Sequence, residues 1–291
     1  MKILTFFSSL ETGDAMSNCK LIPVSVNWHV WPRCNYSCRF CYATFKSGPK
    51  PLDKEVALQI PGMLKVSGTE KLTFAGGEPT LCPYLGDLLK ESKDVGLTTT
   101  MVTNGSLLDR AFLERWHSYI DWIALSIDSA SEETETRLGR GRGGHMARVV
   151  GAAELIKSYS IRLKVNTVIT SLNWNEDMAG IIKVLEPERW KVFQVLGISG
   201  ENDAHFSHLS VSKEQFRSFA DRHKHLNPVV EDNGAMEGSY IMLDPAGRFF
   251  QNFNNEYFYS RSILEVGVER AFTEVGWDSR KFFRRGGLYE W

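Results

Sequence analysis

The sequence lacks three features that would each point to a familiar class of protein. No cysteine follows Cys82, so the C-terminal part has no thiolates for further iron–sulfur clusters or for a secreted disulfide framework. Basic and acidic residues nearly cancel, at 34 Lys plus Arg against 35 Asp plus Glu, so no general positive surplus favours nucleic acid as a partner. The apolar N-terminal stretch is too short to span a bilayer and lacks a clear signal-peptide cleavage pattern. We therefore expect a cytoplasmic protein without a membrane span.

Length and composition allow one large core. The 291 residues are 43% hydrophobic, which is enough for a barrel-sized domain with a smaller appendage. We expect an N-terminal extension over residues 1–20, a barrel over 21–196, and a C-terminal extension over 197–291 that closes over the active site.

Three cysteines form one short loop with the spacing C-x3-C-x2-C, at Cys34, Cys38 and Cys41. Three thiolates at this spacing can hold three irons of a [4Fe–4S] cube and leave the fourth iron open. A structural zinc site is the alternative, but such a site usually has four ligands, and a fourth Cys or His at loop spacing is missing. His29 lies upstream on a predicted strand, where a packed side chain is more usual than a ligand.

Hydrophobic periodicity predicts strands that alternate with helices. Residues 22–30 place apolar side chains on one face and Ser25, Asn27 and His29 on the other, which is typical of a strand. Further strands are expected at 71–75, 98–103, 122–126, 162–169 and 189–195, and helices at 54–64 (capped by Asp53), 107–117, 146–158 and 177–186. This order indicates an α/β fold in which a parallel sheet curls into a partial (β/α)6 barrel.

The pattern changes after residue 196. A polar loop is expected over 197–212, then an amphipathic helix carrying Phe216 and Phe219, and then a strand over 239–244. Tyr240 falls on this last strand, where a tyrosine is ordinarily a packed aromatic side chain with a satisfied hydroxyl.

Polar residues follow the predicted strands at their C-terminal ends, where barrels bind ligands. They are Gly76, Gly77 and Glu78 after the second strand, Thr103 and Asn104 at the end of the third, and Ser126 and Asp128 at the end of the fourth. Paired glycines allow a backbone to approach a ligand closely. Taken singly, each of these residues also fits an ordinary turn or helix cap.

Positive charge is placed on the strands themselves. Lys71 begins the second strand, Lys164 and Asn166 share one face of the fifth, and Arg189 and Lys191 share one face of the sixth. No Asp or Glu shares those faces, and burial of an unpaired cation costs several kcal/mol. Either these side chains run outward to solvent, or they converge on a strongly anionic ligand such as a triphosphate. The second reading is favoured because the outward faces of barrel strands are usually apolar.

The cysteine loop resembles the signature of the radical S-adenosylmethionine (SAM) superfamily, and GGEP at 76–79 resembles a second motif of that superfamily. From about residue 21 to the end, the sequence is similar to one family within it, the viperins and viperin-like enzymes. The matching segments are SVNWH at 25–29, CNYSC at 34–38, GGEP at 76–79, NGS at 104–106, GRG at 139–141, RWKVFQ at 189–194, GEN at 200–202 and RGG at 285–287.

The resemblance implies an activity. Viperins cleave SAM at the open iron to a 5′-deoxyadenosyl radical, which abstracts the 4′ hydrogen of a ribonucleoside triphosphate such as CTP, UTP or GTP. Loss of water then gives the 3′-deoxy-3′,4′-didehydro nucleotide, an antiviral chain terminator. The resemblance also leads us to expect a flavodoxin- or ferredoxin-type electron donor, and Mg²⁺ bound with the nucleotide.

Carried over residue by residue, the resemblance implies a role for each candidate. The iron ligands are Cys34, Cys38 and Cys41. The SAM contacts are Gly76, Gly77, Glu78, Thr103, Asn104, Ser126 and Arg140. The nucleotide contacts are Asn27, Lys71, Lys164, Asn166, Arg189, Lys191 and Arg285. Tyr240 matches the tyrosine that returns a hydrogen atom and an electron to the substrate radical.

The sequence departs from the family pattern in places. Ala75 replaces a serine before GGEP, the loop at 201–212 is short and altered, and we expect no N-terminal membrane helix. Base preference and membrane attachment therefore do not follow from the resemblance. Two other functions stay open: a single-cluster radical SAM enzyme for another small anionic metabolite, and a binding protein with a structural cluster.

Overall fold

The computed structural model describes residues 22–45, 48 and 50–291. The expected N-terminal extension over 1–20 lies outside the described residues. None of the helices in the described part combines the length and the hydropathy that a bilayer crossing requires.

Six parallel strands form the centre of one sheet. They are β1 (Ser25–Trp31), β2 (Lys71–Gly76), β3 (Thr98–Thr103), β4 (Trp122–Ser126), β5 (Arg162–Ile169) and β6 (Arg189–Gln194). Neighbours in sequence are neighbours in the sheet, in the order β1-β2-β3-β4-β5-β6, and each pair is parallel. This arrangement confirms the predicted (β/α)6 pattern.

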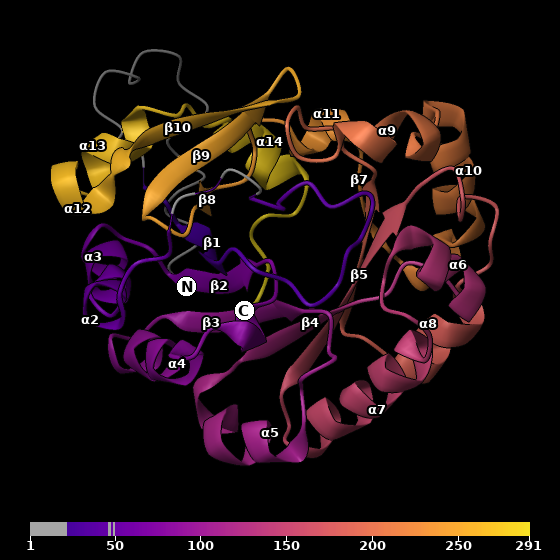
Figure 1. The fold of residues 1–291 in the computed structure, drawn as a ribbon, viewed down its shortest axis with the longest axis horizontal. Helices are drawn as coiled ribbons and strands as arrows, with labels where there is room; N and C mark the ends of the chain where they lie inside the picture. The colour runs from indigo at the N-terminus through magenta and orange to yellow at the C-terminus, as the bar shows by residue number, and fades with distance from the viewer. Residues whose placement is uncertain (1–21, 46–47, 49) are drawn as a thin grey trace.

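Helices surround the curved sheet, and most of them lie on its outer side (Figure 1). In chain order they are α2 (Lys54–Ala57), α3 (Ile60–Val66), α4 (Leu85–Asp94), α5 (Arg110–Trp116), α6 (Glu132–Leu138), α7 (His145–Ser158), α8 (Ala179–Leu185), α9 (Asp203–Leu209), α10 (Lys213–Arg222), α11 (Asn233–Met236), α12 (Ile263–Val266), α13 (Val268–Thr273) and α14 (Ser279–Arg284). Their apolar faces pack on the sheet, as in other barrels.

The C-terminal segment extends both edges of the sheet. Strand β7 (Val229–Glu231) pairs in parallel with β6, and β8 (Met242–Leu243) pairs in parallel with β1. Strands β9 (Arg248–Phe253) and β10 (Glu256–Ser262) continue antiparallel from β8. Because β7 and β10 are the two ends of the ten-stranded order, the barrel is open, which confirms a partial barrel.

Several local predictions are wrong. The expected strand over 239–244 is reduced to β8, so Tyr240 precedes it, and the expected polar loop over 197–212 contains α9. The helix expected over 54–64 is two short helices, α2 and α3, and Asp53 makes no side-chain capping bond. Helix α4 was not predicted.

The side chains of β1 point alternately to the two faces of the sheet, and this alternation determines which of them face the interior of the barrel. Val26, Trp28 and Val30 are buried in the core on one side of the strand. Asn27 and His29 line the inner pocket on the other side. The same periodicity in the other strands separates a packed outer face from a polar inner one.

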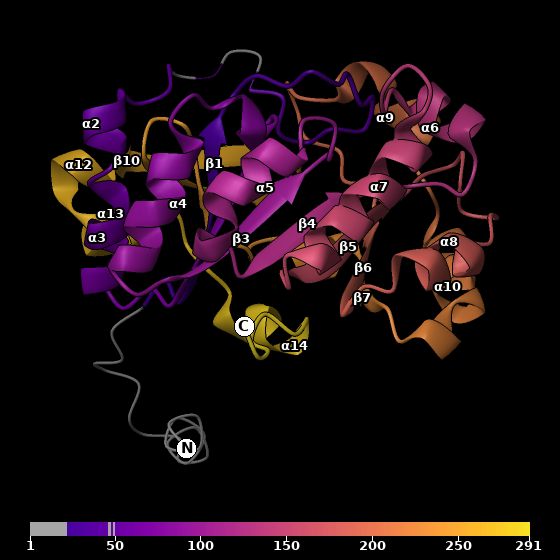
Figure 2. The ribbon, with the colours of Figure 1, turned by 90° about the horizontal axis from the view of Figure 1, so that it is seen from below.

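The end of the described chain returns to the inside of the sheet. Helix α14 and the C terminus lie at the opposite end of the strands from α6 and α9 (Figure 2). From α14 the chain runs inward, where Tyr289 contacts Lys71 at the beginning of β2.

Candidate active site

One pocket of about 300 Å³ occupies the inner face of the sheet. Its volume lies at the lower end of the range for small-molecule sites. Every residue that the sequence analysis assigned to iron, SAM, nucleotide or catalysis lines it. The cations therefore face inward, and the alternative in which they run outward to solvent is wrong.

The pocket has two chemically different ends. The cysteine loop and Gly76 lie at the C-terminal ends of β1 and β2, whereas Lys71 and Arg189 are the first residues of β2 and β6. At about 3.3 Å per residue, the step from Lys71 to Gly76 along β2 spans roughly 16 Å. The sulfur-rich end and the cationic end are thus separated by about the length of one strand.

Glycines allow three loops to meet at the sulfur-rich end. The amide of Gly77 donates to the carbonyl of Trp31 at 2.7 Å, and a Cβ on Gly77 would lie 2.3 Å from the carbonyl oxygen of Arg33. Gly139 has φ +82°, and a Cβ there would lie 2.2 Å from the carbonyl oxygen of Ser37. Any larger residue at either position would push its loop away from the cysteines.

The three thiols suit a cluster better than a single ion. Among the described residues, no three His, Cys, Asp or Glu side chains are arranged to hold one metal ion. In a cube each thiolate binds a different iron, so the thiolates need not meet at one point. Cys34, Cys38 and Cys41 are free and line the same pocket, whereas Cys82 is buried elsewhere. The donor set therefore fits a [4Fe–4S] cluster and does not favour zinc.

Glu78 connects the GGEP loop to the end of β3. One carboxylate oxygen accepts from the hydroxyls of Thr80 and Thr103, each at 2.7 Å. The other oxygen accepts from the backbone N–H of Asn104 at 2.8 Å. Burial raises the pKa of Glu78, and these hydrogen bonds oppose that rise. Asn104 in turn donates to Asn35 at 2.9 Å in the cysteine loop. Glu78, Thr103 and Asn104, three of the predicted SAM contacts, thus form one connected group with the cysteine loop.

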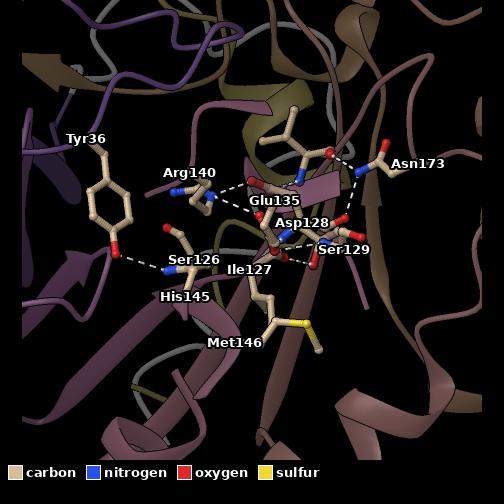
Figure 3. A network of polar contacts seen from close by, with 12 residues as sticks. Tyr36, Ser126, Ile127, Asp128, Ser129, Glu135, Arg140, His145, Met146 and Asn173 are labelled. Carbon is tan, nitrogen blue, oxygen red and sulfur yellow. Dashed lines mark hydrogen bonds and ion pairs between the residues drawn. The ribbon is translucent and has the colours of Figure 1, made fainter. Parts of the chain in front are cut away.

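Arg140 is held by a buried acidic pair (Figure 3). Its Nε donates to Asp128, and it lies 3.9 Å from Glu135. Asp128 accepts from the amide of Val168 at 2.8 Å, and Glu135 accepts from the amide of Asp128 at 2.7 Å. Burial, followed by the nearby Asp128, raises the pKa of Glu135 to about 8. Asp128 is therefore the counter-ion of Arg140, not the helix cap that the sequence also allowed.

His145, the first residue of α7, forms hydrogen bonds with two segments of the same region. Its Nε2 lies 2.9 Å from the carbonyl oxygen of Ser126, and its Nδ1 lies 3.3 Å from the hydroxyl of Tyr36 in the cysteine loop (Figure 3). Burial lowers the pKa of His145 to about 4, so the ring is neutral at physiological pH. A neutral ring suits a bridging role between two hydrogen-bonding groups.

At the opposite end, three cations surround one aromatic ring. Lys71 donates to the Tyr289 hydroxyl at 2.9 Å, and Lys164 donates to the same oxygen. The guanidinium of Arg189 lies 4.2 Å from the Tyr289 ring centroid, within the range of cation–π attraction. Lys71 also lies 4.2 Å from the Trp291 ring centroid. Aromatic faces and one hydroxyl thus provide the negative potential around these cations.

Burial disfavours the protonated, charged form of the lysines in this cluster. It lowers the pKa of Lys71 well below its usual range, and the neighbouring Lys164 adds to the effect. It lowers the pKa of Lys164 to about 6, with Lys191 and Arg189 contributing. An anion that entered this end would reverse both effects, since an opposite charge favours the protonated lysine.

A second group of charges surrounds Tyr240. Its hydroxyl donates to Glu231 and accepts from Lys191 at 2.7 Å. Glu231 forms ion pairs with Lys191 at 2.6 Å and with Arg285 at 3.6 Å. The guanidinium of Arg285 lies 3.6 Å from the Tyr240 ring centroid. Lys191 and Arg285 therefore have an internal counter-ion.

Sequence reasoning missed two residues of the pocket region. Glu231 ends a strand of only three residues, too short for a periodic pattern, and Tyr289 lies in a tail without regular structure. For Glu231 the available signal was an acidic residue directly after two valines. His205 and His208, which are spaced like metal ligands, are both exposed on α9.

Comparison with known proteins agrees with this site. Residues 28–185 match the family model described as the Radical SAM superfamily. An "S-adenosylmethionine-dependent nucleotide dehydratase" of Flammeovirga pacifica is 45% identical over 286 residues, which cover 95% of this chain and 98% of that protein. The "S-adenosylmethionine-dependent nucleotide dehydratase RSAD2" of Oncorhynchus mykiss is 37% identical, with 96% and 84% covered. The crystal structure of Streptococcus suis SuiB bound to S-adenosylmethionine has a TM-score of 0.62 at 15% identity, with 78% and 60% covered.

The chain is therefore a member of the radical SAM superfamily, with the partial barrel of that fold. Membership implies a [4Fe–4S] cluster and SAM as cofactors. Within the superfamily, the chain belongs to the family of S-adenosylmethionine-dependent nucleotide dehydratases, the viperin-like enzymes. The resemblance found in the sequence motifs is thus confirmed.

Proposed function

We propose that this chain dehydrates a ribonucleoside triphosphate, removing the 4′ hydrogen and the 3′ hydroxyl to give the 3′-deoxy-3′,4′-didehydro nucleotide. Cys34, Cys38 and Cys41 would hold the cluster, and the loops around Glu78, Asn104 and Arg140 would hold SAM. When bound, the cluster and SAM supply a carbon-centred radical that abstracts hydrogen.

One observation carries the choice of substrate. In the described part of the chain, Lys71, Lys164 and Arg189 line a buried pocket and form no ion pair with a carboxylate. A buried cation needs an anion or leaves its charge uncompensated. A triphosphate supplies several negative charges in a small volume, and ammonium and guanidinium groups are its usual partners.

The length of the pocket supports the same substrate. A triphosphate at the cationic end would direct its sugar toward the cysteine loop, past Asn27 and Asn166 on β1 and β5. These amides can donate to and accept from ribose hydroxyls. The residues of this chain would thus fix the phosphate at one end and orient the sugar toward the other.

Finer features of the reaction belong to the same proposal. CTP, UTP and GTP are the candidate substrates, with Mg²⁺ on the triphosphate, and the electron would come from a flavodoxin- or ferredoxin-type reductase. A cytoplasmic location would supply the nucleotide and a reducing environment. Tyr240, beside Lys191 and Glu231, would return an electron and a proton to the substrate radical.

The test compares nucleotides in one assay. Reduced, reconstituted protein is incubated with SAM and each of the four ribonucleoside triphosphates, and both 5′-deoxyadenosine and the nucleotide product are measured. At least one triphosphate should accelerate 5′-deoxyadenosine formation. The matching nucleoside should be at least ~100-fold poorer, because it forfeits several charge-assisted hydrogen bonds. If no triphosphate has an effect but another anionic metabolite does, the substrate assignment is wrong.

A matched pair of variants makes the test specific to the pocket. Lys164→Met removes a cation that lines it, whereas Lys157→Met removes a cation paired with Glu186 on the outer surface. Only Lys164→Met should raise the KM for nucleotide, with little effect on SAM binding. Equal loss of SAM and nucleotide binding would show that Lys164 is misplaced in this assignment.

A further inference from the structure

Five cations line the end of the pocket that lies opposite the cysteine loop: Lys71, Lys164, Arg189, Lys191 and Arg285. Within the described part of the chain, Glu231 is the one carboxylate that forms ion pairs with members of this group. It is fully buried at the end of β7, and its ion pairs are with Lys191 and Arg285. Lys71, Lys164 and Arg189 contact Tyr289 instead. Glu231 therefore divides the five cations into a pair with an internal counter-ion and a trio without one.

The pair with the counter-ion surrounds Tyr240. Lys191 donates to the Tyr240 hydroxyl at 2.7 Å, and Arg285 lies against its ring at 3.6 Å. The hydroxyl donates its own hydrogen to Glu231. One carboxylate thus contacts both cations and fixes the direction of the O–H bond between them.

The protonation states agree with this geometry. Burial by itself raises the pKa of Glu231, but Lys191 and Arg285 outweigh burial, and the net pKa is lowered. Burial raises the pKa of Tyr240 well above its usual range, Arg285 opposes this, and Glu231 adds to it. Glu231 is therefore ionised while Tyr240 keeps its proton, which is the state that a donor of an electron and a proton requires.

We propose that Glu231 is a positioning residue for Tyr240, and that its ion pairs with Lys191 and Arg285 hold these two cations against the same tyrosine. This inference rests on the proposed function. In the step concerned, the O–H bond of Tyr240 breaks, its electron goes to the substrate radical, and a proton joins the departing 3′ hydroxide as water. The C3′=C4′ double bond forms. The tyrosyl radical is then reduced back to tyrosine by one electron from the external reductase and one proton.

The main experiment measures coupling. Dehydrated nucleotide formed per 5′-deoxyadenosine is determined for wild type, Glu231→Gln, Tyr240→Phe and the exposed control Glu133→Gln. Glu231→Gln and Tyr240→Phe should each lower this ratio at least threefold, and Glu231→Gln should not raise the Kd for nucleotide. Glu133→Gln should match wild type. A purely structural role would instead raise the Kd and lower 5′-deoxyadenosine formation together, with the ratio unchanged, and that result would overturn the inference.

A second measurement does not depend on turnover. The protein is labelled with 3-fluorotyrosine, and the ¹⁹F resonance of Tyr240 is assigned by its loss in Tyr240→Phe. Glu231→Gln should shift this resonance and its titration, and Glu133→Gln should shift neither. An unmoved resonance overturns the inference even if the enzyme is active. If wild type dehydrates no nucleotide but the resonance moves, the proposed function fails while the contact between Glu231 and Tyr240 stands.

Discussion

Lys71 donates a hydrogen bond to the hydroxyl of Tyr289 at 2.9 Å, so the first residue of β2 is held by a residue from the far end of the sequence. Lys164 donates to the same oxygen. A neutral hydroxyl thus accepts from two lysines at the position where the proposed triphosphate would place charged oxygens.

Replacement of Tyr289 by Phe should tighten nucleotide binding. The ring and its cation–π contacts stay, but the nucleotide no longer has to displace the hydroxyl from Lys71 and Lys164. A hydrogen bond of this kind contributes about 0.5–1.5 kcal/mol net, so the Kd should fall roughly two- to tenfold. Isothermal titration with the preferred triphosphate measures this, and Tyr159→Phe, on the outer α7 side, is the control. Weaker binding would mean that the hydroxyl contacts the nucleotide itself.

Nucleotide affinity should fall as the pH rises. Burial lowers the pKa of Lys164 to about 6 in the empty pocket, with help from Lys191 and Arg189, and a bound triphosphate raises it again. Binding therefore takes up a proton between the free and the bound pKa. Affinity should be highest near the lower value and should decrease by up to about tenfold per pH unit above it. Titrations in buffers of different ionisation enthalpy count the protons, and an unchanged pH slope in Lys164→Met would contradict the assignment.

The same lysine should destabilise the empty fold. Below the ordinary lysine pKa of 10.5 the unfolded chain holds a proton at Lys164, whereas the folded chain does not hold it until about pH 6. Stability is therefore lost as the pH falls through this window. Lys164→Met should raise the free energy of unfolding at about pH 7 by about 1–3 kcal/mol, and less at higher pH. Urea denaturation measures this, and Lys157→Met should stay within about 0.5 kcal/mol of wild type. A stability gain that is independent of pH would exclude titration as its cause.

The barrel and the inward cations could be predicted because they depend on local periodicity. The alternation of β5 places Lys164 and Asn166 on one face. Five of the six central strands begin and end within one residue of the predicted bounds, and the exception is β1. The direction of that face followed from the cost of burying a cation beneath apolar helices. A side chain on a regular strand can thus point to only one of two faces of the sheet.

The partners of these cations could not be predicted in the same way. Glu231 reaches Lys191 across the β6–β7 pairing, and Tyr289 reaches Lys164 over a sequence separation of 125 residues. Neither residue lies in a segment with a periodic pattern. Such contacts depend on how the C-terminal segment folds back, which is a tertiary property that local propensity does not encode.

Asp128→Asn should destabilise the protein far more than the loss of a surface ion pair. Asp128 is fully buried and binds the guanidinium of Arg140, whose own side chain is only 9% exposed, so the substitution leaves a buried charge with one remaining acidic neighbour, Glu135. Breaking a buried pair in this way costs about 3–5 kcal/mol. Asp87→Asn is the matched control, because its pair with Lys54 is nearly half exposed and should contribute less than about 1 kcal/mol. Urea denaturation measures the free energy of unfolding of both variants. Equal losses of stability would show that other groups compensate the charge of Arg140, and that the acidic pair does not hold it beside the cysteine loop.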